Sequence, residues 1–369
     1  MRLGYSLGYW SAGPPPGALE TVIAAERLGF DSVWTSEAYG SDAFTPLAWW
    51  GSRTSTVRLG TAIAQISART PTATAMAALT LDHLSGGRFV LGLGASGPQV
   101  VEGWYGQPYP RPLARTREFV AVVRQVLARE APVTFEGDFY RLPLGPDEGA
   151  GLGKALRPTV HPLRRDLPIH LAAEGPRNVA LAAEIADGWL PMFYSPRMDG
   201  EYRALLAEGF AARTDDRDPA AFEVVAPVPV VLADDVEAAA EQIRPFVALY
   251  AGGMGAKGAN FHRNVLDRLG YAAVCDEIQA HYLAGDKDRA AAAVPVELVR
   301  DVALVGTPDD VRGQLAAWRA TAVTTLVVQG DPRTLPAVAA VLAEPTTEPT
   351  TGPTTGPTTG PITGPAAAG

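Results

Sequence analysis

The chain contains a single cysteine, Cys275, among its 369 residues. One cysteine excludes a disulfide framework and a multi-cysteine metal site within the chain. Such sparing use of cysteine is typical of a reducing compartment. The first six residues also lack the basic and apolar segments of a secretory signal. We therefore expect a cytoplasmic location.

Positive charge and long apolar runs are also scarce. The chain has 31 lysines and arginines against 40 aspartates and glutamates, a formal net charge of −9. A nucleic-acid-binding protein needs a basic surface, so this balance argues against that class. The apolar run at 224–233 contains Pro227 and Pro229 and is much shorter than the roughly 20 apolar residues that span a bilayer. We expect neither a nucleic acid nor a membrane as a partner.

Several catalytic motifs are missing as well. The five histidines show neither H-x-x-x-H nor H-E-x-x-H spacing, and no grouping of carboxylates completes a metal site. We therefore predict that the protein binds no metal. The absence of G-x-S-x-G leaves a serine hydrolase without support.

The most informative segment that the chain does have is GGRFVLGLG at 86–94, directly after an expected helix at 72–84. A double glycine suits the left-handed end of a helix. The apolar strand that follows closes on Gly92 and Gly94, where a flat ligand could approach bare backbone.

This alternation of helix, turn and strand recurs along the chain. Apolar strand-like segments lie at 3–9, 32–35, 58–66, 89–94, 169–173, 188–193, 223–232 and 324–328, and helical patterns separate them, as at 18–28, 116–127, 234–249 and 309–320. Eight such units favour a closed (β/α)8 barrel over an open sheet. Catalytic groups are then expected at the carboxyl ends of the strands.

The spacing of the strand-like and helical segments also predicts the domain organisation. One barrel domain is expected over 1–343, with long loops at 95–115 and 136–167 and an insertion at about 252–300, all placed at the carboxyl-terminal mouth. The Thr/Gly/Pro repeats of 344–369 cannot build a core. We expect this tail to be disordered and without a catalytic function.

The segment at 92–97 formally matches G-x-G-x-x-G, the dinucleotide-binding pattern. That pattern requires a helix to start here, and Pro98 together with the glycines at 103 and 106 argues against one. A glycine-lined wall beside a flat ring system is the alternative interpretation, which we favour.

Acidic and aromatic residues follow the second strand, where Glu37, Tyr39 and Asp42 would surround the mouth. Glu37 is a candidate acid or base, with Tyr39 as a second proton donor. Pairing of Glu37 with an arginine is the other possibility, and both stay open. Asp42 is better explained as the cap of a helix at 45–53.

Groups that could hold an anion follow the fifth and sixth strands. Ala173, Glu174, Gly175 and Asn178 lie at an expected helix start, where backbone N–H groups favour phosphate. Ser195 and Arg197 follow the next strand. Lys257, and a basic run at 154–165, either hold a polyanionic tail or form a solvated face. Trp104 and Tyr105, in a polar loop, are candidate substrate contacts.

Five segments together resemble the bacterial-luciferase-like superfamily, and specifically its branch of oxidoreductases that use the deazaflavin coenzyme F420. They lie at 28–34 (LGFDSVW), 58–62 (RLGTA), 81–88 (LDHLSGGR), 91–94 (LGLG) and 186–189 (ADGW). The resemblance implies a TIM barrel with the cofactor ring at the mouth. It also implies a non-prolyl cis peptide in a bulge of the third strand, within 62–66, and phosphate held by the loop after the fifth strand.

The resemblance implies hydride transfer between F420 and a small organic substrate. The implied contacts of the cofactor also include Ala62, Ile63, Ala64, Gln65, Gly94, Ser96 and Gly97. Several members have Asp-His where this chain has Ser36-Glu37, so Glu37 either donates the proton or only contacts the cofactor. The alternatives are an FMN-dependent monooxygenase that uses O2 and a partner flavin reductase, and a non-catalytic cofactor carrier. Family members often form homodimers through the early barrel helices.

Overall fold

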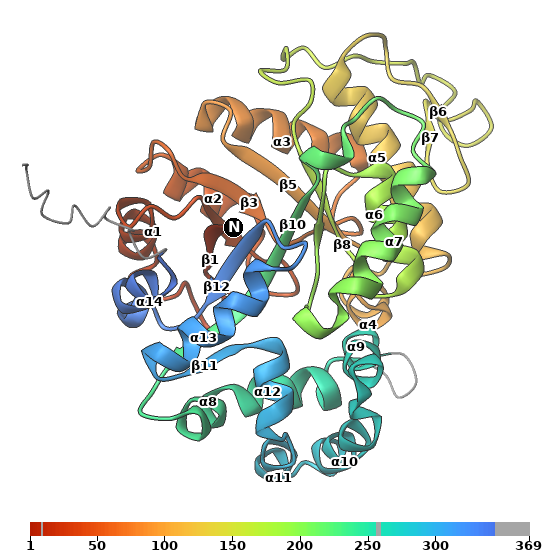
Figure 1. Cartoon of the computed structure of the whole chain (residues 1–369). Helices are drawn as coiled ribbons and strands as arrows, with labels where there is room; N and C mark the ends of the chain where they lie inside the picture. The colour runs from red at the N-terminus through yellow and green to blue at the C-terminus, as the bar shows by residue number, and fades with distance from the viewer. Residues whose placement is uncertain (9, 256–259, 344–369) are drawn as a thin grey trace, which may run out of the picture.

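The structure, a computed structural model, describes residues 1–8, 10–255 and 260–343. Its centre is a closed barrel of parallel strands in chain order, in which β12 pairs with β1 and β9 pairs with β10 (Figure 1). The barrel strands are β1 (Arg2–Ser6), β2 (Ser32–Thr35), β3 (Arg58–Thr61), β5 (Phe89–Gly94), β8 (Ile169–Ala172), β9 (Gly188–Leu190), β10 (Glu223–Leu232) and β12 (Thr325–Gln329). All eight predicted strands are present, and the predicted closed barrel is confirmed.

The third predicted strand, at 58–66, is divided in two. β3 ends at Thr61, and the short β4 (Ala64–Gln65) pairs separately with the end of β5. The peptide bond between them, Ala62–Ile63, is cis. The non-prolyl cis bond implied by the family resemblance is therefore present at the expected place.

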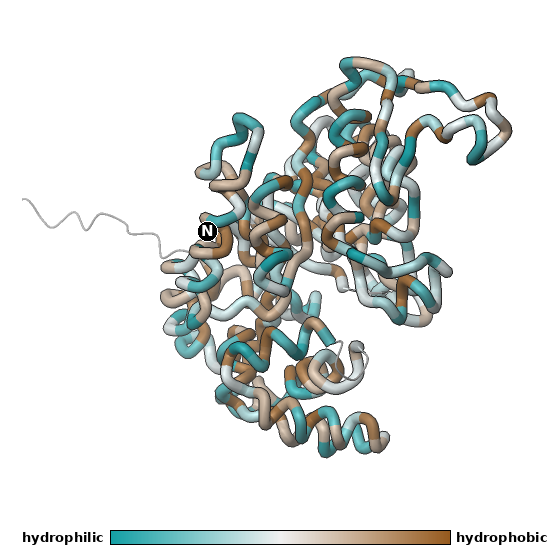
Figure 2. The backbone as a smooth tube through the Cα atoms, turned by 90° about the vertical axis from the view of Figure 1, so that its right-hand side faces the viewer, coloured by the Kyte–Doolittle hydropathy of each residue, from teal (hydrophilic) through white to brown (hydrophobic). Residues whose placement is uncertain are grey.

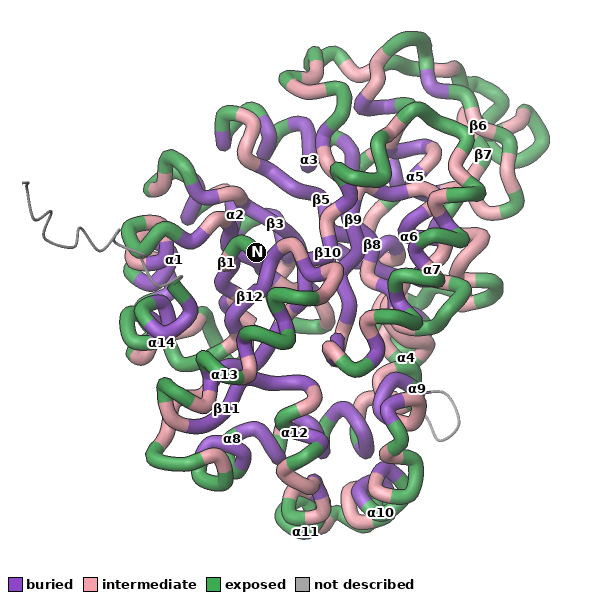
Figure 3. Tube along the Cα trace, viewed as in Figure 1, coloured by how far each residue is buried: buried purple, intermediate pink, exposed green. Residues whose placement is uncertain are grey.

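Helices surround the barrel, so that buried strands lie inside an exposed outer layer (Figure 3). The hydropathy view shows the same division, with apolar segments in the interior and polar turns outside (Figure 2). The helices are α1 (Ala18–Arg27), α2 (Phe44–Gly51), α3 (Pro71–Ser85), α4 (Pro98–Gly103), α5 (Pro112–Ala128), α6 (Pro176–Ile185), α7 (Asp199–Ala211), α8 (Val236–Ala248), α9 (Phe261–Leu266), α10 (Ala272–Leu283), α11 (Lys287–Ala292), α12 (Val296–Val302), α13 (Pro308–Arg319) and α14 (Leu335–Leu342).

Local sequence signals explain most helix ends. Helix α3 ends at Gly86 and Gly87, which have φ values of 65° and 86°, a region that glycine adopts without steric cost. The helix expected at 234–249 is capped by Asp235, whose side chain accepts from the Ala238 N–H at 2.7 Å. The expectation that no helix follows Gly97 is wrong, because Pro98 starts α4; proline suits a first helical position, where its missing N–H would have no partner.

Two insertions extend the barrel. Helices α9 to α12 gather with α8 along one side, at the bottom of Figure 1, between β10 and a short additional strand, β11 (Leu304–Gly306). A hairpin of β6 (Phe135–Glu136) and β7 (Arg141–Leu142) lies at the opposite end of the view. Lys257 and the tail at 344–369, predicted to be disordered, lie outside the described residues. Among those that are described, no helix has the length and apolarity to cross a bilayer.

The barrel interior is filled by one large ring. The indole of Trp34 on β2 packs with Val90, Leu190 and Val327 from other strands. A Cβ placed on Gly60 of β3 would lie only 2.2 Å from Cε3 of Trp34. Glycine at 60 therefore makes room for the indole, which blocks the barrel beneath its mouth.

A charged cluster closes the amino-terminal end of the barrel. Arg58 donates to both carboxylate oxygens of Glu223, at 3.0 and 2.9 Å. His170 is fully buried, stacks against Trp34 with ring centroids 6.0 Å apart, and places Nε2 3.2 Å from Glu223. Burial would raise the pKa of Glu223, but His170 and Arg58 outweigh it and hold the pKa well below its usual value.

Candidate active site

A small cavity of about 70 Å³ lies at the carboxyl ends of the barrel strands. Its lining is mostly apolar, with a few polar side chains: Ser6, Trp34, Ser36, Ala62, Leu190, Met192, Val225, Pro227, Tyr250, Val327 and Gln329. Trp34 supports it from below. A largely apolar recess of this size, with a few polar groups, can contact one face or edge of a ring system.

The segment around the cis peptide is fixed by the loop that follows β2. The Ser36 hydroxyl donates to the Ala62 carbonyl at 2.9 Å, and the Glu37 N–H donates to the Ile63 carbonyl at 3.1 Å. The Ala62 N–H in turn donates to the Thr35 carbonyl at 2.6 Å. The backbone of 62–63 is therefore held rigidly at the edge of the cavity.

Glu37 is buried, with 4% of its side chain exposed. Arg69 donates to both of its carboxylate oxygens, at 2.9 and 2.8 Å, and the Gln65 N–H donates to Oε2 at 2.9 Å. The arginine pair, one of the two alternatives for this residue, is therefore present. Both oxygens act as acceptors, and through Gln65 the carboxylate fixes β4. A catalytic role for Glu37 stays a prediction.

The loop after β5 covers the loop after β2. The Tyr105 hydroxyl donates to the Ala38 carbonyl at 2.9 Å. Burial and the nearby Glu37 carboxylate raise the pKa of Tyr105 above its usual value. Tyr39 and Trp104 are 61% and 64% exposed. Their predicted roles in proton donation and substrate contact are untested.

The glycines at the end of β5 serve the packing of the chain itself. A Cβ on Gly92 would lie 1.7 Å from the Thr61 carbonyl oxygen, and one on Gly94 would lie 2.9 Å from the Ile63 side chain. The space beside both is filled by β3 and the segment after it. This differs from the glycine-lined wall expected from the sequence, and contact of Gly94 with a cofactor stays a prediction.

The start of α6 has the features of a phosphate site. Gly175 is its N-cap and offers no side-chain cap, and a Cβ built there would meet nothing within 4 Å. The first N–H groups of a helix have no partner within the helix and attract anions. Asn178 donates to the Ala172 carbonyl at 3.4 Å, and the Ala173 carbonyl accepts from Trp189 at 2.8 Å.

The insertion places a histidine and an arginine beside this helix start. His262 of α9 lies 2.7 Å from a carboxylate oxygen of Glu174, and Arg268 donates to the Glu174 carbonyl at 2.7 Å. Among the described residues, Glu174 Oε2 and Arg268 Nε are buried without a hydrogen-bond partner. The sequence analysis missed His262 and Arg268, because about ninety residues separate them from Glu174 and no motif connects them.

The remaining predicted residues are more dispersed. Ser195 is fully buried and caps the short 3-10 turn η1 (Pro196–Met198), which it precedes. Ser96 has φ of 58°, and its carbonyl accepts from the Tyr109 hydroxyl at 2.7 Å. Gly97 is the N-cap of α4. Asp42, as predicted, caps α2 by accepting from the Phe44 and Thr45 N–H groups.

Of the predicted cofactor contacts that the structure describes, only Ala62 lines the mouth cavity directly. Sequence reasoning missed Ser6, Met192 and Gln329, which lie within or directly after the strands predicted at 3–9, 188–193 and 324–328. That position was the available signal. Across 1–8, 10–255 and 260–343, no three His, Cys, Asp or Glu side chains form a group that could hold a metal ion.

A closed (β/α)8 barrel with a recess at its mouth, a cis peptide beside it and a helix start open to an anion defines a class of barrel proteins suited to a flat cofactor with a phosphate group. The model of the luciferase-like monooxygenase family matches residues 4–325. The chain belongs to this family.

Three known proteins show where the chain stands in it. A Mycobacterium tuberculosis protein described provisionally as a coenzyme F420-dependent oxidoreductase is 61% identical, over 89% of this chain and 94% of its own length. The 5,10-methylenetetrahydromethanopterin reductase of Archaeoglobus fulgidus is 30% identical, over 84% of this chain and 88% of its own. The solved F420-dependent tetrahydromethanopterin reductase of Methanopyrus kandleri has the same fold, with a TM-score of 0.75, 24% identity and coverage of 92% and 97%.

Proposed function

We propose that the protein is an oxidoreductase that transfers a hydride between coenzyme F420 and a small organic substrate. The observation that carries the proposal is the start of α6 at Gly175, which has no side-chain cap and is open to an anion. The name of the 61% identical relative supports F420 as the cofactor.

The residues present fit this cofactor. The apolar recess over Trp34 suits a planar ring, and the uncapped start of α6 suits its phosphate. When bound, F420 supplies a two-electron carrier that gives or accepts a hydride. The chain binds the phosphate at Gly175, supports the ring with the backbone of 62–64, excludes water with the apolar lining, and keeps a proton on the Tyr105 hydroxyl.

The first test is titration of the purified protein with F420 and, separately, with FMN at matched salt, followed by fluorescence. We expect saturable binding of F420 and at least tenfold weaker binding of FMN. A preference for FMN would contradict the proposal and favour oxygen chemistry with a partner flavin reductase. Binding of neither would favour a protein without this cofactor chemistry.

The proposed partners are a small-molecule substrate and a second copy of the chain. Helix α3 carries two large apolar side chains on the surface, Met76 and Leu84, which are 61% and 69% exposed. Exposed apolar groups on an early barrel helix support a homodimer through this face. Light scattering during gel filtration measures it, and a monomer at micromolar concentration would contradict it.

A further inference from the structure

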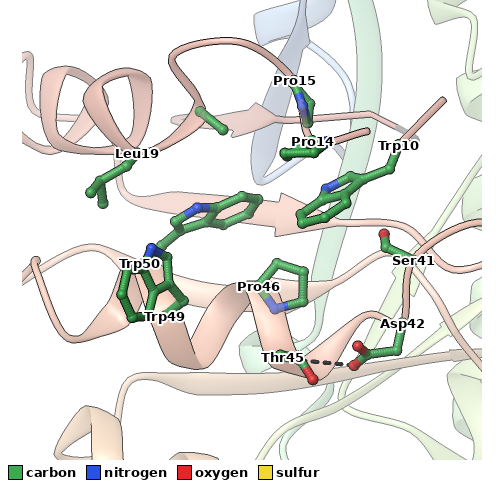
Figure 4. A pocket seen from close by; sticks show the side chains of 11 residues that line it. Trp10, Pro14, Pro15, Leu19, Ser41, Asp42, Thr45, Pro46, Trp49 and Trp50 are labelled. Carbon is green, nitrogen blue, oxygen red and sulfur yellow. Dashed lines mark hydrogen bonds between the residues drawn. The ribbon is translucent and has the colours of Figure 1, made fainter. Parts of the chain in front are cut away.

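A second and larger cavity, of about 500 Å³, lies outside the barrel (Figure 4). Its walls come from the loop after β1, the start of α1, the loop after β2 and the outer face of α2. The lining residues are Trp10, Pro14, Pro15, Ala18, Leu19, Ser41, Asp42, Thr45, Pro46, Trp49 and Trp50. None of them lines the mouth cavity, so the two cavities have separate linings.

The lining is dominated by flat and rigid groups. Figure 4 shows the indoles of Trp10 and Trp50 at the same level, with Pro14 and Pro15 on one side and Pro46 on the other. Aromatic and proline rings offer large apolar faces and lose little conformational entropy when they contact a ligand. A cavity of this size and lining is within the range that encloses small organic molecules.

The cavity is held open by close packing between its two loops. A Cβ on Gly40 would lie 2.9 Å from the Trp10 carbonyl oxygen, so the loops after β1 and β2 are in direct contact. Trp50 is 3% exposed and anchored in the core, whereas Trp49, the next residue, is 63% exposed at the rim. The binding surface is therefore present without a ligand.

Asp42 is the one charged side chain in this lining. Its Oδ1 accepts from the Phe44 and Thr45 N–H groups, at 2.9 and 2.8 Å. Its Oδ2 has no hydrogen bond to any residue that the structure describes. The cavity thus offers a single carboxylate oxygen to a donor, and it disfavours anions.

We propose that this cavity is a binding site for a flat aromatic molecule that carries an O–H or N–H donor and no negative charge. The rings stack within the indole and proline walls, and the donor bonds to Oδ2 of Asp42. The site goes beyond the proposed hydride transfer and does not depend on F420.

Calorimetric titration of the full chain with two probes of the same ring tests the proposal. At pH 7, 2-naphthol is neutral and carries a donor, while 2-naphthoate is an anion. We expect saturable 1:1 binding of 2-naphthol, and at least tenfold weaker binding of 2-naphthoate. Equal affinities, or no binding of 2-naphthol, would overturn the proposal.

Asp42→Asn is the decisive variant, because Asn caps a helix as well as Asp and the fold is kept. It replaces the free acceptor by a donor, so affinity for 2-naphthol falls about tenfold and affinity for 2-naphthoate rises. Trp49→Ala lowers the affinity for both probes. Leu283→Ala removes an exposed apolar side chain outside the cavity and leaves both affinities unchanged. An unchanged preference in Asp42→Asn would overturn the assignment.

Two further measurements distinguish other occupants. Deletion of 344–369 leaves 2-naphthol binding unchanged if the cavity is free, and strengthens it if the proline-rich tail occupies the cavity. Affinity that falls as protein concentration rises would show instead that a second copy covers it. Stronger binding after the deletion, or an affinity that depends on protein concentration in this way, overturns the proposal. Titration with F420 in the same preparations shows separately whether the proposed function fails.

Discussion

At the scale of single residues, the structure changes the interpretation of Glu37. Its position after the second strand suggested an acid or base, yet both carboxylate oxygens accept hydrogen bonds from Arg69 and Gln65. An acceptor held in this way positions the backbone better than it delivers a proton. The sequence located the residue correctly, but it could not show its partner, because Arg69 lies 32 positions further along the chain.

The variant Glu37→Gln distinguishes a residue that positions the backbone from one that donates a proton. Removing the charge leaves Arg69 half-buried without its partner, which costs about 1–3 kcal/mol of stability. If Glu37 positions the 62–65 segment, the affinity for F420 falls at least tenfold and the pH profile of kcat is unchanged. Denaturant unfolding, F420 titration and pH–rate profiles measure these effects.

Unchanged F420 affinity with a kcat lowered a hundredfold or more would instead identify Glu37 as the proton donor. Glu26→Gln is the matched control. The Glu26 carboxylate accepts from the N–H groups of 55–57, away from the mouth, so its loss affects stability and leaves F420 affinity unchanged.

At the scale of elements, the strands were predictable and the details at their ends were not. Strands buried on both faces are continuous apolar runs, which is why 32–35 and 89–94 match β2 and β5 to the residue. Both β3 and β4 pair with β5, and β3 pairs with β2 as well; a local pattern does not show that this pairing is interrupted at 62–63. Helix α4 was missed because proline was taken as a helix breaker where it is a helix start.

The start of α6 provides a prediction at this scale. Gly175 has φ of −77° and open space beside it, so either Asp or Ser fits and supplies the missing cap. Both Gly175→Asp and Gly175→Ser should stabilise the protein, by a few tenths of a kcal/mol. Only the carboxylate repels a phosphate, so F420 affinity falls at least tenfold in Gly175→Asp and less in Gly175→Ser. Thermal unfolding and F420 titration measure the two effects, and equal affinities would exclude α6 as the phosphate site.

At the scale of the whole molecule, the closed barrel depends on a charged cluster at its amino-terminal end. Glu223 connects β10 with Arg58 of β3 and His170 of β8 across the barrel. The pKa of Glu223 is lower in the folded protein than in the unfolded chain, so folding favours its ionised form. This contribution to stability is complete above the unfolded pKa, about 4.3, and is lost as the pH falls below it.

The variant Glu223→Gln tests this contribution. It should lower the free energy of unfolding at pH 7 by about 3 kcal/mol, since Arg58 loses a largely buried partner. The variant should also lose less stability than the natural protein between pH 6 and pH 3. Urea unfolding across this range measures both quantities. Glu130→Gln, at an exposed position, is the control and should keep the acid dependence of the natural protein.

The indole that fills the barrel also limits how deep a ligand can go. Trp34 stands where it does because Gly60 has no side chain, so the floor of the mouth is set from a neighbouring strand. In a relative with a smaller residue at 34 and glycine kept at 60, the mouth would reach further down between the strands. The floor of the recess would then select substrates by length, and changing it would alter specificity without altering the chemistry above.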